Sequence, residues 1–252
     1  MYKEFHLGGP LEPFVECAWV LSHPRNGDRA NGAGASRRIL PDGCTDLVVT
    51  LGKSVEFFGP AISFRDVAND DDFAGLRLRP GAAAALIGAA AEEIANQSVS
   101  LAAIWGQPGR DIEDRLASAT RPDAVLSTLE SALAKPALAA RDRDSAVLEA
   151  VDRLRRFPGT KVNQLAADFD LSERQLRRRF LRHVGLNMKQ LGRIIRFQRF
   201  VDGLRIRRRR FAGSPPSWAG LACDHGYADQ AHLIRESRAI AGATPAELLM
   251  NC

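Results

Sequence analysis

The chain has 252 residues, of which 45% are hydrophobic, and a formal net charge of +5. This length favours two domains, and the hydrophobic content allows substantial buried cores. No apolar run reaches the ~18 residues of a transmembrane helix, and the N-terminus lacks the basic-then-apolar order of a signal peptide. We therefore expect a cytoplasmic protein with no membrane partner.

The net charge hides an asymmetry between the two halves of the chain. Residues 1–145 contain 15 Lys and Arg against 20 Asp and Glu, whereas residues 146–252 contain 20 against 10. A basic half is typical of a module that binds nucleic acid. Because charge alone binds phosphate backbones without sequence preference, it does not indicate a specific reader of DNA.

The N-terminal half is predicted to be a small β structure followed by helices. Four segments have the composition of strands: 11–21, 44–51, 55–59 and 76–81. Pro41-Asp42-Gly43 predicts a turn before the second of them. After Gly81 the chain is alanine-rich, and residues 100–140 carry apolar residues at helical spacing. Asp142-Arg143-Asp144 marks the expected linker.

Few residues of this half are candidates for chemistry. Cys44 follows a turn and precedes Asp46, so it is either a reactive thiol or a small structural residue. His6 and His23 lack metal-ligand spacing and the four cysteines are scattered, so we expect no metal site and no disulfide framework. We find no nucleophile motif or phosphate-binding loop, and therefore expect no enzyme and no cofactor. Several aromatic residues either form the core or line a ligand cavity: Trp19, Trp105, Phe57, Phe58, Phe64 and Phe73.

The C-terminal half is predicted to be entirely helical. Helices are expected over 146–157, 162–169, 173–184 and 188–210, then from Trp218 and from Gln230. Ser172 and Gln175 form a capping-box pattern, and Gly185 ends that helix. Ser217 and Asp229 are the expected caps of the last two helices, after a break over 213–217.

Two helix-turn-helix patterns are present in this half. In the first, residues 165–171 precede the helix that begins after Ser172, and in the second, residues 221–228 precede the helix that begins after Asp229. Such a second helix fits the major groove, where arginine binds guanine and glutamine binds adenine with two hydrogen bonds each. Two recognition helices about 34 Å apart would reach successive grooves on one side of the duplex.

Residues 146–252 resemble the DNA-binding domain of the AraC/XylS family of transcription regulators. The resemblance is most specific over Gly226–Arg235 and at Gly242-Ala243-Thr244-Pro245. It implies groove contacts from seven residues: Arg174, Arg177, Arg178, Gln230, Ala231, Ile234 and Arg235. Ser237 departs from the family, which has an aromatic residue where the first motif has Phe180. We expect the loss of an aromatic from a small core to cost a few kcal/mol and to seat the second helix less firmly.

The N-terminal half resembles a cupin-like domain of unknown role that occurs on some AraC-type regulators, through Pro13–Glu16, Leu40–Leu47 and Arg79–Gly81. The fold expected is thus a two-domain α+β chain, with a cupin-like sensor or dimerisation domain over 1–145 and tandem helix-turn-helix units joined by a long helix over 146–252. The resemblance implies double-stranded DNA and RNA polymerase as partners, and a small effector or a second copy as further ones.

Three functions compete at this point. The first is a sequence-specific transcription regulator of the AraC family, either activator or repressor. The second is a DNA-coupled cysteine methyl acceptor or redox sensor that uses Cys44. The third is a nonspecific basic DNA-coating protein, which the acidic N-terminal half and the ordered second motif disfavour.

Overall fold

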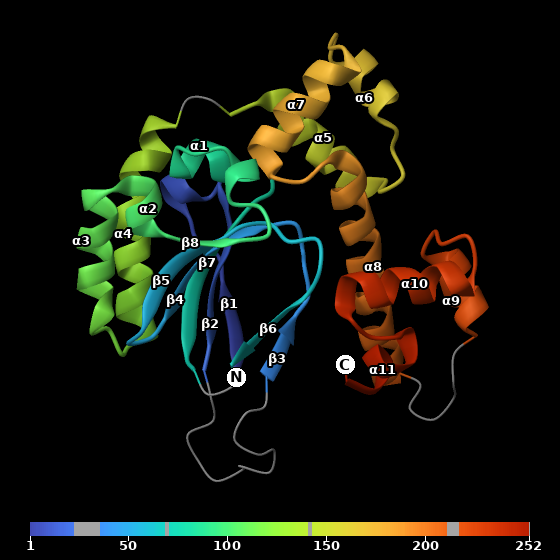
Figure 1. The fold of residues 1–252 in the computed structure, drawn as a ribbon, viewed down its shortest axis with the longest axis horizontal. Coiled ribbons are helices and arrows are strands. Elements are labelled where there is room, and N and C mark those ends of the chain that lie inside the picture. The colour runs from blue at the N-terminus through green and yellow to red at the C-terminus, as the bar shows by residue number, and fades with distance from the viewer. Residues whose placement is uncertain (23–35, 69–70, 141–142, 211–216, 252) are drawn as a thin grey trace.

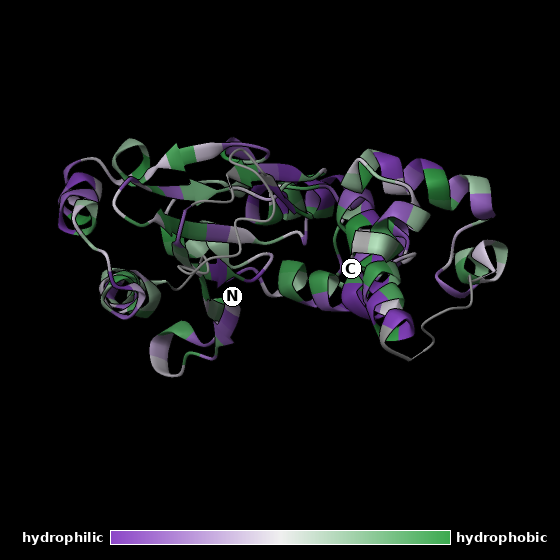
Figure 2. Cartoon of the chain, turned by 90° about the horizontal axis from the view of Figure 1, so that it is seen from below, coloured by the Kyte–Doolittle hydropathy of each residue, from purple (hydrophilic) through white to green (hydrophobic). Residues whose placement is uncertain are grey.

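A computed structural model of the chain describes residues 1–22, 36–68, 71–140, 143–210 and 217–251. A β-rich N-terminal domain lies beside a helical C-terminal domain (Figure 1). Polar and apolar residues alternate along the strands and helices of both (Figure 2). Within the described residues, no helix combines the length and apolar character needed to cross a membrane.

The N-terminal domain is built on a six-stranded antiparallel sheet of order β1-β2-β7-β4-β5-β8. Its strands are β1 (Tyr2–Phe5), β2 (Val15–Leu21), β4 (Thr45–Thr50), β5 (Ser54–Phe58), β7 (Phe73–Leu78) and β8 (Ser98–Ser100). A separate two-stranded sheet pairs β3 (Ser36–Ile39) with β6 (Arg65–Ala68). The predicted turn at residues 41–43 is confirmed, because Gly43 has φ +81° and the Cys44 N–H donates to Asp42 Oδ1 at 2.9 Å.

The two faces of the large sheet have different neighbours. Ala18, Leu47 and Val49 point into the core, which α4 (Pro122–Ala139) closes with Leu129 and Leu133. Trp19 and Val48, one residue along their strands, face a cavity on the other side. Successive side chains of a strand point to opposite faces of its sheet, which accounts for this alternation between core and cavity.

Short helices complete this domain: η1 (Gly9–Leu11), α1 (Ala83–Ile87), η2 (Ala91–Glu93), α2 (Leu101–Trp105) and α3 (Gln107–Ala117). The strand predicted over 11–21 begins only at Val15, because Leu11 ends the turn η1. Strands β1, β3, β6 and β8 have three or four residues each, too few to show a clear alternation in the sequence.

The C-terminal domain has two three-helix units that share one long helix. The first contains α5 (Ser145–Arg156), α6 (Val162–Asp168) and α7 (Glu173–Val184), and the second α9 (Trp218–Asp224), α10 (Gln230–Ala241) and α11 (Pro245–Asn251). The shared helix α8 (Met188–Arg210) places Leu191 and Ile194 in the first core and Phe200 and Leu204 in the second. Helix α8 has the predicted bounds, whereas most of the predicted break over 213–217 lies outside the described residues.

The core of the N-terminal domain extends to Ala137 and Ala140, and that of the first helical unit begins at Val147. The predicted domain boundary after residue 145 lies between these two cores in the sequence.

Candidate DNA interface and ligand pocket

Helix α7 begins with the predicted capping box. Ser172 Oγ accepts from the Gln175 N–H at 3.2 Å, and Gln175 Oε1 accepts from the Ser172 N–H at 2.9 Å. Gly185 ends the helix in the left-handed conformation, with φ +78°. Leu176 and Phe180 lie in the core, since residues four apart share one face of a helix.

The three arginines that the sequence assigns to the first recognition helix lie outside that core. Arg174, Arg177 and Arg178 are all exposed. Arg177 donates to Glu173 Oε2 at 2.8 Å, an exposed pair within the helix that is worth only a few tenths of a kcal/mol. A phosphate or a base could therefore displace Glu173 at little cost.

Helix α10 is the second candidate recognition helix and follows the same plan. Asp229 Oδ1 accepts from the His232 N–H at 2.6 Å, which is the predicted cap, and Gly242 ends the helix with φ +64°. Leu233 and Ile240 are buried. Of the predicted contact residues, three are exposed and Ile234 is half-buried; the exposed ones are Gln230, Ala231 and Arg235.

A bidentate ion pair connects each recognition helix to a neighbouring element. On α7, Arg179 donates from Nε and Nη2 to the two oxygens of Asp144, at 2.5 and 2.8 Å. Asp144 is buried and also caps α5 through the Val147 N–H. Burial opposes its ionisation, but the hydrogen bonds from Arg179 and Val147 outweigh burial and lower its pKa.

On α10, Glu236 accepts two hydrogen bonds from Arg193 of α8, both at 2.9 Å. Arg179 and Glu236 follow the equivalent residues Arg178 and Arg235. At this equivalent position α7 therefore carries a cation, Arg179, and α10 an anion, Glu236. Each forms a bidentate ion pair that holds its recognition helix in place.

The expectation about Ser237 stays a prediction, which the packing around this residue makes specific. Ser237 is 0% exposed, so the second core closes over the position without an aromatic residue there. Buried residues of α5 fall at 147, 150, 151 and 154, and those of the second half of α8 fall at 197, 200, 201 and 204, with the same spacing. Where α5 has Val147 and Ala150, α8 has Phe197 and Phe200. The Phe197 and Phe200 rings, with centroids 6.2 Å apart, both belong to the second core, so that core already holds two aromatic side chains.

A cavity of about 960 Å³ lies between the two domains, and we call it the interdomain pocket. Its N-terminal wall comes from the strands of both sheets, and helices α8 and α11 contribute Gln198, Val201, Arg205 and Leu248. Of the aromatic residues considered in the sequence, Trp19, Phe58 and Phe73 line it. Phe57 and Trp105 instead form an edge-on pair, with ring centroids 5.2 Å apart, in the domain core.

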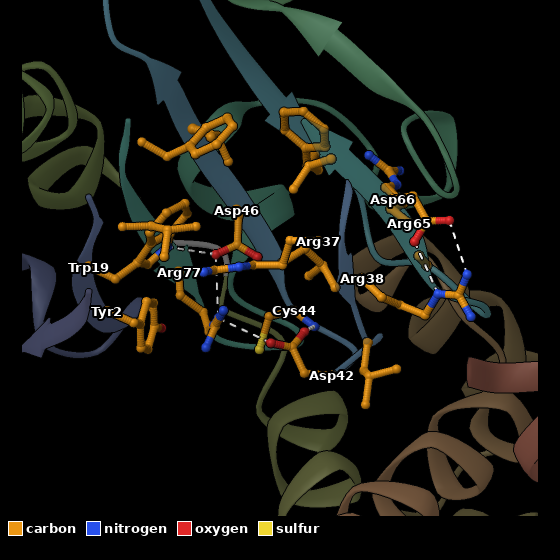
Figure 3. Close-up of a pocket in the computed structure, with 18 of the residues that line it drawn as sticks. Tyr2, Trp19, Arg37, Arg38, Asp42, Cys44, Asp46, Arg65, Asp66 and Arg77 are labelled. Carbon is orange, nitrogen blue, oxygen red and sulfur yellow. Dashed lines mark hydrogen bonds and ion pairs between the residues drawn. The ribbon is translucent and has the colours of Figure 1, made fainter. Parts of the chain in front are cut away.

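A half-buried charge cluster lines the interdomain pocket (Figure 3). Arg77 Nε lies 3.1 Å from Asp42 Oδ2 and 3.3 Å from Asp46 Oδ1, and Trp19 Nε1 donates to Asp46 Oδ1 at 3.0 Å. Burial raises the pKa of Asp46 to about 6, against the attraction of Arg77.

Two further arginines of the interdomain pocket lie outside the ion pairs that the described residues form. Neither Arg37 nor Arg65 forms an ion pair with any residue that the structure describes, and both line the cavity. The guanidinium of Arg65 lies 4.9 Å from the Phe58 ring centroid and donates to the Gln97 carbonyl at 3.1 Å. Neither Arg37 nor Arg65 was predicted from the sequence, because an isolated arginine in a short strand forms no recognisable pattern.

Cys44 does not have the surroundings of a nucleophile. It is buried, and its burial raises the pKa of the thiol well above the ordinary value, with Asp42 and Glu16 adding to the effect. Its Sγ lies 3.7 Å from Glu16 Oε2, which Arg155 of α5 binds at 2.8 Å. Reactive thiols need a lowered pKa and access, so this environment favours the structural role. No cluster of three metal-ligating side chains occurs in the described ranges.

Family models match both halves of the chain. A domain of unknown function, DUF6597, matches residues 4–100, and a helix-turn-helix domain matches residues 165–251. No curated protein sequence matches the chain.

Solved structures of ToxT from Vibrio cholerae are similar to the chain. One matches at 8% identity, with a TM-score of 0.44, over 86% of this chain and 90% of its own. A second, ToxT bound to (E)-4-(8-methylnaphthalen-1-yl)but-3-enoic acid, matches at 10% identity, with a TM-score of 0.43, over the same shares.

Proposed function

We propose that this chain, a DNA-binding transcription regulator with an AraC-type helix-turn-helix domain, reads two adjacent major-groove segments with α7 and α10. The observation that carries the proposal is the exposure of Arg174, Arg177 and Arg178 on a helix whose other face is buried. Arginine can bind guanine O6 and N7 with two hydrogen bonds, which reads the base as well as its phosphate.

Helix α10 is proposed to contact DNA with fewer charged side chains than α7. Gln230 and Arg235 supply its hydrogen bonds, and Ala231 and Ile234 supply apolar contacts of the kind that a thymine methyl group accepts. Because α7 carries three of the four candidate contact arginines, we expect the first box to provide most of the affinity.

Selection of bound duplexes from a random pool, at an ionic strength near 0.15 M, tests this proposal with the full chain. We expect two enriched boxes about one helical turn apart. Arg178→Ala should relax the sequence at one box and Arg235→Ala at the other, at a cost of about 1–3 kcal/mol each.

The matched controls are Arg182→Ala and Arg238→Ala, which remove exposed arginines of the same helices outside the predicted contact set. They should weaken binding evenly without changing either motif, as loss of a phosphate contact does. Unchanged motifs after both contact substitutions would refute the assignment. Salt-dependent binding with no enriched motif would favour the nonspecific DNA-coating protein.

We further propose that a small effector binds in the interdomain pocket. Its apolar walls and the two arginines outside the described ion pairs, Arg37 and Arg65, fit an organic anion with an aromatic or aliphatic body. Since α8 and α11 form part of the wall, such a ligand would touch the DNA-binding domain directly.

The dye 1-anilinonaphthalene-8-sulfonate has this chemistry and can serve as the probe. We expect its fluorescence to rise on binding and Trp19 fluorescence to be quenched. Arg37→Ala should weaken dye binding several-fold, whereas Arg110→Ala, an exposed arginine on α3, should not. Equal affinity of the two variants would refute the ligand class and leave the DNA assignment intact.

A second copy of the chain and RNA polymerase remain proposed partners. Sedimentation of the full chain, alone and on its selected duplex, tests the dimer that the resemblance of residues 1–145 implies. Transcription from that duplex by purified polymerase tests the other partner and gives the sign of regulation.

A further inference from the structure

Residues 59–65, which run from the end of β5 to the first residue of β6, lie against the helical domain, and we call them the β5–β6 segment. The segment is held in place by hydrogen bonds to the turn that follows η2. The Gly59 N–H donates to the Gln97 carbonyl at 3.0 Å, the Asn96 N–H to the Pro60 carbonyl at 3.0 Å, and the Ile62 N–H to Asn96 Oδ1 at 3.0 Å. These bonds make the segment a fixed support.

One end of the β5–β6 segment meets the last residue of the first recognition helix. Pro60 packs on Gly185, which ends α7, and a Cβ added at Gly185 would lie 2.7 Å from Pro60 Cγ. The same Cβ would lie 2.7 Å from the Ala91 carbonyl oxygen of η2. The contact thus requires glycine both for its φ of +78° and for close approach.

The other end meets the last turn of the second recognition helix. The Phe64 N–H donates to the Ile240 carbonyl at 2.8 Å, and the Phe64 ring packs directly on Gly242, which ends α10. Arg38, whose Cζ lies 3.9 Å from the centroid of that ring, donates to the Ala241 carbonyl at 3.1 Å. Two carbonyls that the end of a helix leaves without partners are therefore satisfied by the N-terminal domain.

Gly185 and Gly242 are equivalent residues of the two units, since each is the left-handed residue that ends a recognition helix. The same point of both helices is thus docked on Pro60 and Phe64, which are four residues apart. Four residues span at most about 14 Å even when fully extended. A short, anchored stretch of the N-terminal domain therefore joins the two recognition helices, in parallel with the covalent link through α8.

We infer that the β5–β6 segment, together with Arg38, sets the distance and angle between the two recognition helices. It thereby determines which spacing between two DNA boxes the chain accepts, although it lies at the opposite end of each helix from the residues proposed to contact bases. The inference rests on the proposed function, because a box spacing exists only if both helices read DNA.

The physical basis is the effective concentration of the second helix at its box once the first is bound. That concentration is highest when the held geometry matches the DNA and falls when the tether is loosened. Alternate residues of the segment, Gly59, Ala61, Ser63 and Arg65, line the interdomain pocket. The same stretch therefore faces the pocket on one side and both recognition helices on the other.

The test uses the full chain and duplexes that carry both selected boxes, with the spacing changed one base pair at a time around one helical turn. The unaltered chain should prefer one spacing. The Phe64→Ala and Arg38→Gln variants should each bind the duplex of preferred spacing about fivefold or more weakly than the unaltered chain. Their affinity for duplexes of other spacings should change little, because only the coupling between the two recognition helices is lost. Affinity for a duplex with the first box alone should not change.

Phe5→Ala is the matched control, because Phe5 is 46% exposed and lines a second cavity beside α4 rather than the interdomain pocket. If Phe64→Ala fails to fold, Arg38→Gln carries the test alone, since its side chain is 39% exposed. A spacing preference that stays the same in the variant would overturn the inference and assign the spacing to α8. If the unaltered chain does not bind duplexes that carry both boxes, the proposed function is overturned, and the inference with it.

Discussion

Replacing Ser237 distinguishes a well-filled second core from a weakened one. The side chain is fully buried, and its Oγ has no hydrogen-bond partner among the described residues. An unsatisfied buried hydroxyl costs about 1–3 kcal/mol, and alanine is favoured over serine within a helix by about 0.5 kcal/mol. We therefore expect Ser237→Ala to stabilise the second unit by about 1–2 kcal/mol, after allowance for the lost packing of one oxygen.

The family-like residue should have the opposite effect. If Phe197 and Phe200 already occupy the space, Ser237→Phe overpacks the core and destabilises it by about 1–3 kcal/mol. Adding Phe197→Ala or Phe200→Ala to Ser237→Phe should then cost less than the sum of the single changes, by about 1–3 kcal/mol, because the sites share one volume.

The assay is urea unfolding followed by tryptophan fluorescence. The chain has three tryptophans, and Trp218 of α9 packs against the second core. A background with Trp19→Phe and Trp105→Phe leaves Trp218 as a local probe of that unit. Stabilisation by Ser237→Phe would refute the reasoning, since it would mean that an aromatic-sized space is empty. Destabilisation by Ser237→Ala would mean that the hydroxyl has a partner, such as an ordered water.

Three other predictions follow from buried polar groups. Asp144→Ala should destabilise the first unit by about 2 kcal/mol, through loss of the α5 cap and the pair with Arg179, whereas Asp144→Asn should cost less because it keeps a capping acceptor. Since the pKa of Asp144 is lowered by folding, this stabilisation is complete above about pH 4 and is lost below it, which unfolding at several pH values can measure. The pKa of Asp46 is instead raised to about 6, so the folded domain takes up a proton first and its stability should rise as the pH falls from 6 to 4; Asp46→Asn should remove that trend. In a Cys252→Ser background, alkylation of the native protein should modify the exposed Cys223 and spare Cys44, as read by mass spectrometry, whereas fast labelling of Cys44 would revive the reactive-thiol hypothesis.

Local sequence determined the helices of the DNA-binding half. The caps at Ser172 and Asp229 and the left-handed Gly185 are where the sequence predicts them. These signals act within one turn of chain, so their energetics do not depend on distant residues. The exposure of the candidate contact arginines also follows from the apolar period of α7, which assigns its opposite face to the core.

Tertiary structure decided the features that depend on residues far apart in the chain. The packing around Ser237 cannot be predicted from the motif, because Phe197 of the same core lies forty residues earlier, on a helix whose register the motif does not specify. Similarly, nothing local to Pro60 or Phe64 indicates that they receive the ends of two recognition helices, because that contact exists only once both domains have folded and packed. Caps and periodic faces are properties of consecutive residues, whereas volumes, ion pairs and interdomain contacts are properties of the assembled chain.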